Sequence, residues 1–293
     1  MTNITLKQLR YFEAVAHHRH FGHAAEACAI SQPALSVQIK ELEQNLQTPL
    51  FDRGGRNITL TSFGVDFAPR ARAILQGVDE LQDMARASKD GLMGRLRIGI
   101  IPTIGPYLLP SIITKLTQMN PALDIHVRET MTPRLITELT EGRIDTAIVA
   151  LPVSEPSLTE VTLFDEKFML VRPEADRDKP IPSSAHLNEM KLLLLEEGHC
   201  FRDQALSFCD MQSETAREGL DASSLSTLVQ MVGAGIGVTL IPEMAVAVET
   251  RSAQVAVNAF PAPEPTRRVG MIWRKTSPLA SKLSEIADLI RPT

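Results

Sequence analysis

Two of the chain's three cysteines lie close together, in the stretch LLLLEEGHCFRDQALSFCD at residues 192–210. His199 precedes Cys200 directly, and Arg202 follows it at two positions. Both side chains can supply hydrogen-bond donors and positive potential that favour a thiolate. A thiolate is the form of cysteine that attacks an electrophile such as a peroxide oxygen. This stretch therefore predicts reactive thiol chemistry at Cys200.

The same residues also allow a purely structural interpretation. Free cysteine is often a small buried hydrophobe, and Cys209 follows Phe208 on an apparently helical segment, so by itself it suits a core position. Glu196 and Glu197 would oppose thiolate formation if they also lay near Cys200 in space. Spacing alone leaves both interpretations open.

The segment between the two cysteines has the pattern of a helix. FRDQALSFC contains no Pro or Gly, and Phe201, Ala205 and Phe208 recur near helical spacing. Along a continuous helix, the α-carbons of Cys200 and Cys209 would be ~13 Å apart, whereas a disulfide tolerates about 7 Å or less. A disulfide between them would require the helix to unwind.

Composition limits the class of protein. A chain of 293 residues with 44% hydrophobic and 22% charged content is long enough for two or three compact units. No apolar run approaches the ~20 residues of a membrane span, and charges interrupt the opening residues, so we expect no signal peptide, no membrane association and a cytoplasmic location. Thiols there are normally reduced, which makes any disulfide catalytic or redox-sensing. No Cys/His cluster has metal-binding spacing, so no metal or other cofactor is expected.

Short helices fill the first sixty residues. Apolar periodicity predicts helices over 5–18, 22–27 and 31–46, with Ser31 as the N-cap of the third and Pro33 in its first turn. Two short helices joined by a tight turn form the helix-turn-helix plan, although a small helical bundle with a solvated polar face has the same periodicity. The net charge of −5 does not by itself suggest a nucleic-acid partner, but it can hide a local basic surface.

Polar residues on the third helix are of the types that contact DNA. Gln32, Ser36 and Gln38 can hydrogen-bond base edges, and Lys40 can reach a phosphate. In LFDRGGRNITLT, Gly54 and Gly55 can form a hairpin turn, flanked by Arg53 and Arg56 as a basic wing.

The segment AAEACAISQPALSVQIKELEQNLQTPLFDRGGRNITLTSFG resembles the N-terminal domain of LysR-type transcriptional regulators. The resemblance implies a winged helix-turn-helix that binds double-stranded DNA at an inverted-repeat promoter site. Its expected contacts are Ser31, Gln32, Pro33, Ser36, Gln38, Lys40, Arg53 and Arg56. Val37 departs from the family, because many members carry Arg or another polar residue at this position. Cys28 is expected to be a packing residue in the core of the helix-turn-helix.

A long apolar seam follows the predicted wing. Phe63, Phe67, Ile74 and Leu81 are among the residues that recur at helical spacing over 62–87, with Pro69 expected to kink the helix or disturb its early turns. The resemblance implies that this linker helix pairs with a second copy to form a dimer. A tetramer built from two dimers is also expected, and the sequence leaves dimer and tetramer open. The polar, glycine-containing SKDGLMGR then supplies a hinge.

Strands and helices alternate from residue 94 onward, as in parallel α/β units. We therefore predict three parts: a DNA-binding domain at 1–61, a linker helix and hinge at 62–93, and a regulatory domain at 94–293. The family resemblance implies an α/β regulatory domain with two lobes, like the periplasmic binding proteins. Ligands in open α/β sheets tend to lie beyond the carboxyl ends of strands, which here points to Pro102, Thr103 and Thr132.

The stretch EEGHCFRDQALSFC resembles the redox segment of the peroxide-sensing members of the LysR-type regulators, and IPTIGPYLLP and LFDEKFMLV agree with the same members. The resemblance implies that Cys200 is the peroxidatic cysteine and Cys209 the resolving one. It also implies that hydrogen peroxide is bound by Thr103, Thr132, His199, Arg202 and Asp203.

The implied mechanism is a reversible disulfide. The thiolate becomes a sulfenic acid, which condenses with the second cysteine, and a cytosolic thiol reductant resets the pair. The disulfide would change the spacing of the DNA-binding heads and thereby the contact with RNA polymerase.

Three other functions share part of this pattern. A LysR-type regulator that responds to a small metabolite in the crevice between the lobes is the nearest alternative. A solute-binding protein would share the two lobes but not the helix-turn-helix. A thiol peroxidase would use similar cysteines but has no use for a DNA-binding head, so we expect a regulator rather than an enzyme.

Overall fold

The computed structural model describes residues 4–52, 58–87, 94–187, 190–209 and 221–291. The chain forms two compact units, Met1–Met84 and Ala85–Thr293, and each is described by itself. In the described residues, no helix has the length and apolar character needed to traverse a bilayer.

The first unit is a three-helix core with a short hairpin. Helices α1 (Leu6–His18), α2 (Phe21–Ala27) and α3 (Gln32–Leu46) pack together around Phe12, Leu35 and Ile39, which are fully buried. Strands β1 (Phe51–Asp52) and β2 (Thr59–Leu60) then pair antiparallel. The three predicted helices are confirmed, and β1 and β2 are the two strands that the predicted hairpin requires. The predicted turn at Gly54 and Gly55 lies outside the described residues.

Local capping explains where these helices begin. Thr5 caps α1 through a capping box in which its hydroxyl accepts from the backbone N–H of Gln8 and the Gln8 side chain accepts from the backbone N–H of Thr5. Ser31 caps α3 by accepting from the N–H of Ala34, and Pro33 occupies the first turn, where its missing N–H costs no helical hydrogen bond. The N-cap predicted at Ser31 is confirmed.

Helix α4 (Ser62–Ala87) continues without interruption through Pro69. One side of the helix packs on the helical core through Ala68, Ala71 and Leu75, which are buried. Phe63, Val65, Ile74 and Leu81 stay 40–64% exposed. The apolar seam therefore divides into a side used within the chain and a side without a partner in the described part of the chain.

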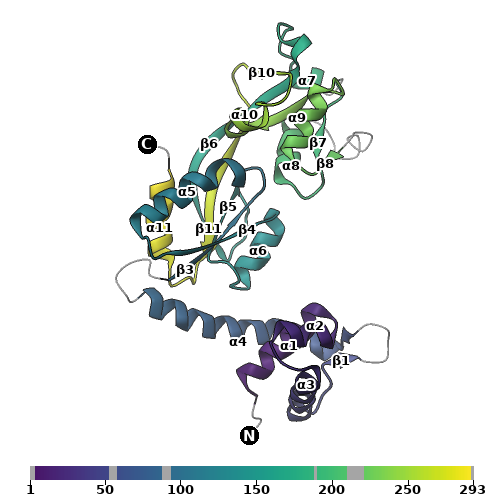
Figure 1. The fold of residues 1–293 in the computed structure, drawn as a ribbon, viewed down its shortest axis with the longest axis vertical. Coiled ribbons are helices and arrows are strands. Elements are labelled where there is room, and N and C mark those ends of the chain that lie inside the picture. Colours follow the sequence, from purple (N-terminus) through teal and green to yellow (C-terminus); the bar gives the residue numbers. More distant parts are fainter. Residues whose placement is uncertain (1–3, 53–57, 88–93, 188–189, 210–220, 292–293) are drawn as a thin grey trace. The chain divides into compact units, whose positions relative to one another are not determined.

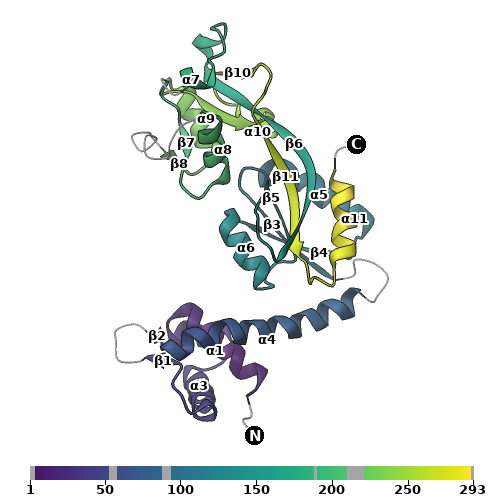
Figure 2. The ribbon, with the colours of Figure 1, turned by 180° about the vertical axis from the view of Figure 1, so that it is seen from behind.

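The second unit is built on one mixed sheet of seven strands, which Figures 1 and 2 show from opposite sides. Strand β3 (Arg95–Ile100) pairs in parallel with β4 (Asp124–Glu129) and β5 (Thr146–Leu151). The long strands β6 (Leu158–Pro173) and β11 (Thr266–Arg274) are antiparallel to their neighbours. The prediction of parallel α/β units was thus wrong for the part of the sheet that contains β6 and β11. The reason is that β11 returns from the far end of the chain and inserts between β5 and β6.

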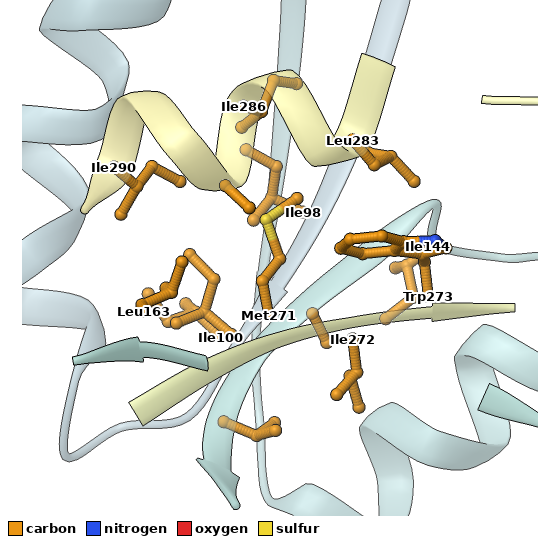
Figure 3. Packing of buried hydrophobic residues seen from close by; sticks show 14 of the residues in the cluster. Ile98, Ile100, Ile144, Leu163, Met271, Ile272, Trp273, Leu283, Ile286 and Ile290 are labelled. Atoms are coloured by element: carbon orange, nitrogen blue, oxygen red, sulfur yellow. The ribbon is translucent and has the colours of Figure 1, made fainter. Parts of the chain in front are cut away.

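Two hydrophobic cores define two lobes. Lobe I comprises residues 96–163 and 269–290 and carries α5 (Gly105–Met119), α6 (Thr132–Thr140) and α11 (Ala280–Ile290). In Figure 3, Leu283, Ile286 and Ile290 of α11 lie on one side of Met271, with Ile98 and Trp273 beside it. These side chains are almost fully buried and form the support for the turns that follow β3 and β4.

Lobe II comprises residues 168–260. Its elements are η1 (Glu174–Asp176), α7 (Ser184–Leu187), β7 (Leu194–Leu195), α8 (Cys200–Phe208), β8 (Asp221–Ala222), α9 (Leu225–Gly233), β9 (Thr239–Pro242), α10 (Glu243–Glu249) and β10 (Val255–Ala259). Strands β6 and β11 run between the two lobes (Figures 1 and 2). Tyr107 of α5 also donates a 2.6 Å hydrogen bond to Glu249 of α10, which ties lobe I to lobe II.

Candidate functional site

A small pocket lies where the two lobes meet. Lobe I contributes the turn after β3, with Ile101, Pro102 and Thr103, and the start of α6, with Met131 and Thr132; lobe II contributes Gly198, His199 and Cys200. The pocket has a volume of about 10 Å³, which is close to the least space that one water molecule needs. Four of the residues predicted from the sequence, Thr103, Thr132, His199 and Cys200, are therefore brought together around a space suited to a very small molecule.

Cys200 is the first residue of α8 and is a free, partly buried cysteine. Burial raises the pKa of its thiol, and the charges and hydrogen bonds around it act in both directions. The positive charge of Arg267, the Thr132 hydroxyl and the backbone N–H of Phe201 lower this pKa, while the charge of Asp203 raises it. The surroundings thus compensate in part for the cost of holding a thiolate in a buried place.

Arg267 of β11 provides the positive charge of the site. Its guanidinium donates to the Thr103 hydroxyl at 2.8 Å, to the Thr103 carbonyl oxygen at 2.9 Å and to Glu166 at 2.7 Å. It also lies over the ring of Phe201, 5.6 Å from the ring centroid. Only 2% of the arginine is exposed, so its charge acts in a low-dielectric environment and is screened little by water. Sequence reasoning missed this residue.

Two helix N-termini also face the pocket. Thr132 and Cys200 are the first residues of α6 and α8, and neither helix has a side-chain cap at its N-terminus. Uncapped backbone N–H groups and the helix dipole favour negative charge at such a position. The Thr132 hydroxyl is itself buried and lies beside the Cys200 thiol, whose pKa it lowers. The pocket therefore offers donors to an anion or to a small polar molecule beside the Cys200 sulfur.

Of the three remaining residues predicted to bind peroxide, His199 lines the pocket, whereas Arg202 and Asp203 do not. His199 lines the pocket, but burial lowers the pKa of its imidazole, which favours the neutral form. Arg202 is buried and donates to the Leu195 carbonyl oxygen at 2.7 Å and to Asp221 at 2.9 Å. It thereby fastens α8 to β7 and β8, and it does not line the pocket. Asp203 is exposed and also lies off the pocket wall. The positive potential expected from His199 and Arg202 comes from Arg267 instead.

Cys209 lies at the opposite end of α8, as the C-cap residue, and is fully buried in the core of lobe II. Burial raises the pKa of its thiol to about 11, so it stays protonated near neutral pH. Cys200, by contrast, packs against the core of lobe I. The predicted helix between them is confirmed, and a rise of about 1.5 Å per residue separates the α-carbons of the two cysteines by ~13 Å.

Five of the predicted DNA-contacting residues lie at the N-cap and in the first two turns of α3, and Lys40 lies in the middle of this helix. Ser31, Gln32, Pro33 and Lys40 are exposed, whereas Ser36 and Gln38 are partly buried. Gln38 already donates to Glu41 at 2.8 Å, within its own helix. Arg53 and Arg56 lie outside the described residues. In the residues that the structure does describe, no group of three or more His, Cys, Asp or Glu side chains is placed to hold a metal ion.

Two family descriptions match nearly the whole chain. Residues 6–65 match the bacterial regulatory helix-turn-helix proteins of the lysR family, and residues 89–293 match the LysR substrate binding domain. The chain is 40% identical over 292 residues to the DNA-binding transcriptional dual regulator OxyR of Escherichia coli, covering 98% of this chain and 95% of that protein. It is 42% identical to a probable hydrogen peroxide-inducible genes activator of Streptomyces viridosporus, covering 98% of this chain and 93% of the relative.

Solved structures of similar proteins have the same fold as this chain. A cysteine-to-aspartate variant of full-length OxyR from Pseudomonas aeruginosa superposes with a TM-score of 0.77 at 37% identity, covering 98% of this chain and 95% of that one. A cysteine variant of Corynebacterium glutamicum OxyR with hydrogen peroxide bound gives a TM-score of 0.66 at 34% identity, covering 99% and 92% of the two chains. With both family descriptions matched and this identity along its whole length, the chain belongs to the LysR family of bacterial regulatory helix-turn-helix proteins.

Proposed function

We propose that this chain is a transcription regulator that senses hydrogen peroxide through Cys200 and Cys209 and controls oxidative-stress genes. The observation that carries the proposal is the pocket at Cys200. It has room for about one small polar molecule, and donors from both lobes surround it. This pocket is far smaller than the ~300–1,000 Å³ of sites for drug-sized ligands, so it favours a very small ligand over a large metabolite. A relative 34% identical to this chain has hydrogen peroxide bound.

The chemistry begins at the Cys200 sulfur. Its thiolate attacks one peroxide oxygen, the O–O bond breaks, and hydroxide leaves and takes up a proton to become water, so that Cys200 becomes a sulfenic acid. Arg267 stabilises the negative charge of the thiolate, and Arg267 also holds the Thr103 hydroxyl in place. Thr103, Thr132 and His199 line the space in which the peroxide would lie. Arg202 holds α8 in place from outside the pocket, whereas the charge of Asp203 raises the pKa of the Cys200 thiol.

The second step couples this reaction to a change of shape. The Cys209 thiol attacks the sulfenic sulfur, water leaves, and a disulfide forms. The α-carbons of a disulfide lie within about 7 Å of each other, so α8 must unwind and at least one of the two cysteines must leave its present packing. Phe201 and Leu206, both buried on the same helix, would lose their packing in the process. Oxidation of one sulfur is thereby converted into the rearrangement of a whole element.

The rearrangement of α8 would alter how the DNA-binding unit contacts DNA. α3 would read an inverted-repeat promoter site, and the exposed side of α4 would pair with a second copy to form a dimer, with dimers joining into a tetramer. Rearrangement of α8 would alter the fit between regulatory domains and so the spacing of the DNA-binding heads and the contact with RNA polymerase. A cytosolic thiol reductant would restore the reduced form. A thiol peroxidase would form the same disulfide, so what separates the two functions is the effect of the disulfide on DNA binding.

A non-reducing peptide map after brief exposure to one equivalent of hydrogen peroxide tests the proposal. We expect a single new cross-linked peptide pair, Cys200 with Cys209, and changed protection of the promoter site in footprinting. Steady consumption of peroxide in the presence of a thiol reductant, with unchanged footprinting, would instead identify a peroxidase. Unchanged thiols and unchanged footprinting would favour a metabolite-responsive regulator.

A further inference from the structure

A second oxidisable sulfur lines the Cys200 pocket. Met131 is the N-cap residue of α6, is only partly buried and contributes to the pocket wall from the lobe opposite to Cys200. Anything small enough to reach the Cys200 thiol from solvent therefore also meets the Met131 thioether. The mechanism above does not use this residue.

The Met131 sulfur is packed closely against the turn that carries Cys200. A β-carbon built on Gly198 would lie only 2.7 Å from the Met131 Sδ atom, so the sulfur occupies the space that a side chain at position 198 would need. Gly198 has φ of +96°, a backbone conformation that favours glycine. The thioether thus lies directly against Gly198, two residues before Cys200.

We propose that Met131 is a second oxidation site, and that its sulfoxide slows the reaction of Cys200 with peroxide. The oxidant is a hypohalous acid such as hypochlorous acid. A sulfur–oxygen bond forms, the oxygen–chlorine bond breaks, the thioether loses two electrons, and chloride and a proton leave. The product is methionine sulfoxide, which is polar and is restored by methionine sulfoxide reductases rather than by simple thiols.

The sulfoxide oxygen competes for the same space and the same donor as the peroxide. The pocket volume is about 10 Å³, so one added oxygen atom on its wall takes up much of the room. The buried hydroxyl of Thr132, the next residue in the chain, lines the same pocket and is the donor that we assign to the new oxygen. The sulfur already fills the space left by the missing side chain of Gly198, so it has no further room on that side. The regulator would then respond less to peroxide until the sulfoxide is reduced.

The effect on Cys200 rests on the proposed peroxide-sensing function. The test therefore distinguishes a failure of the Met131 inference from a failure of that function. The full-length protein is treated briefly with limiting hypochlorous acid, and a thiol reductant then restores reversibly oxidised cysteines. Peptide mass mapping reports which of the 11 methionines carry an oxygen. The rate of Cys200 oxidation by hydrogen peroxide is then followed by alkylating the thiol that remains free, counting only molecules whose Cys200 was free at the start.

We expect oxygen on Met131 and a loss of roughly tenfold in the Cys200 rate, the size of effect that follows from one lost hydrogen bond. In Met131→Leu, a swap of similar volume, the Cys200 rate after treatment should equal that of the same variant before treatment. The matched control is Met119→Leu, because Met119 is 59% exposed on α5 and away from the pocket; this variant should slow as the unmodified sequence does. Methionine sulfoxide reductase should restore the rate.

Three outcomes would overturn the inference: no oxygen on Met131 while Met119 is oxidised, an unchanged rate despite oxidised Met131, or equal slowing of Met131→Leu. A Cys200 that does not react with peroxide even before treatment would instead reject the proposed function, whatever the fate of Met131.

Discussion

The buried Arg202 provides a way to shift the set point of the switch without touching the pocket. Arg202 donates to the Leu195 carbonyl oxygen and to Asp221, and these contacts hold α8 in its reduced position. Because α8 must unwind for the disulfide to form, the contacts exist only in the reduced form. Replacing Arg202 by Met keeps the apolar stem and removes the donors, so it destabilises the reduced form selectively.

The size of the shift follows from the contacts. Arg202 is 3% exposed and Asp221 has a side chain that is 38% exposed, so the ion pair is partly screened and the main loss is hydrogen bonding to a charged group. Such hydrogen bonds contribute ~1.5–3 kcal/mol. For a two-electron couple, 1.4 kcal/mol corresponds to about 30 mV, so the reduction potential of the cysteine pair should become more negative by roughly 30–65 mV.

The assay is a redox titration of the full-length protein in thiol–disulfide buffers, with the disulfide quantified by alkylation. Arg177→Met is the control, because Arg177 is 60% exposed and pairs with Glu174 one turn away on the surface; it should not move the potential. A folded Arg202→Met protein with an unchanged or less negative potential would refute the idea that α8 is held by this residue only in the reduced state.

Further measurements address the cysteines and the DNA-binding helix. Cys200→Ser should abolish the peroxide response, Cys209→Ser should still lose one thiol to peroxide without forming the intramolecular disulfide, and Cys28→Ser should respond normally; a folded, DNA-bound Cys28→Ser protein that cannot respond would contradict these roles. Gln32→Ala or Ser36→Ala should weaken binding to the specific promoter site more than to random duplex, by ~1–3 kcal/mol in a titration by fluorescence anisotropy; equal losses on both would reject base contacts. Burial raises the pKa of the Cys209 thiol from 9.0 to about 11, and only the unfolded thiol ionises between these values, so stability to urea should fall as pH rises through this window. This loss of stability should be smaller in Cys209→Val. If the variant and the unmodified protein had the same dependence of stability on pH, the burial of the Cys209 thiol as a neutral group would be contradicted.

Local sequence signals were sufficient for the helices of the first unit and for the helix that carries the cysteines. The helices around Phe12 and Leu35 follow from apolar periodicity, and their starts follow from capping residues such as Thr5 and Ser31, since both effects act within one or two turns. The helix from Cys200 to Phe208 likewise follows from its composition. So does the conclusion that the two thiols are too far apart to react at rest, because helical rise depends only on residue count.

Tertiary structure alone decided what surrounds Cys200. Arg267 reaches the site only because β11 returns from the end of the chain and inserts between β5 and β6, and no local pattern specifies that pairing. Arg202 is close to Cys200 in sequence, yet its side chain leaves the helix toward Asp221 and the Leu195 carbonyl oxygen. Sequence distance gives the side-chain types near a reactive group, but the direction of each side chain depends on the packing of its element. The charge that acts on the thiol therefore comes from a residue remote in the chain rather than from its sequence neighbours.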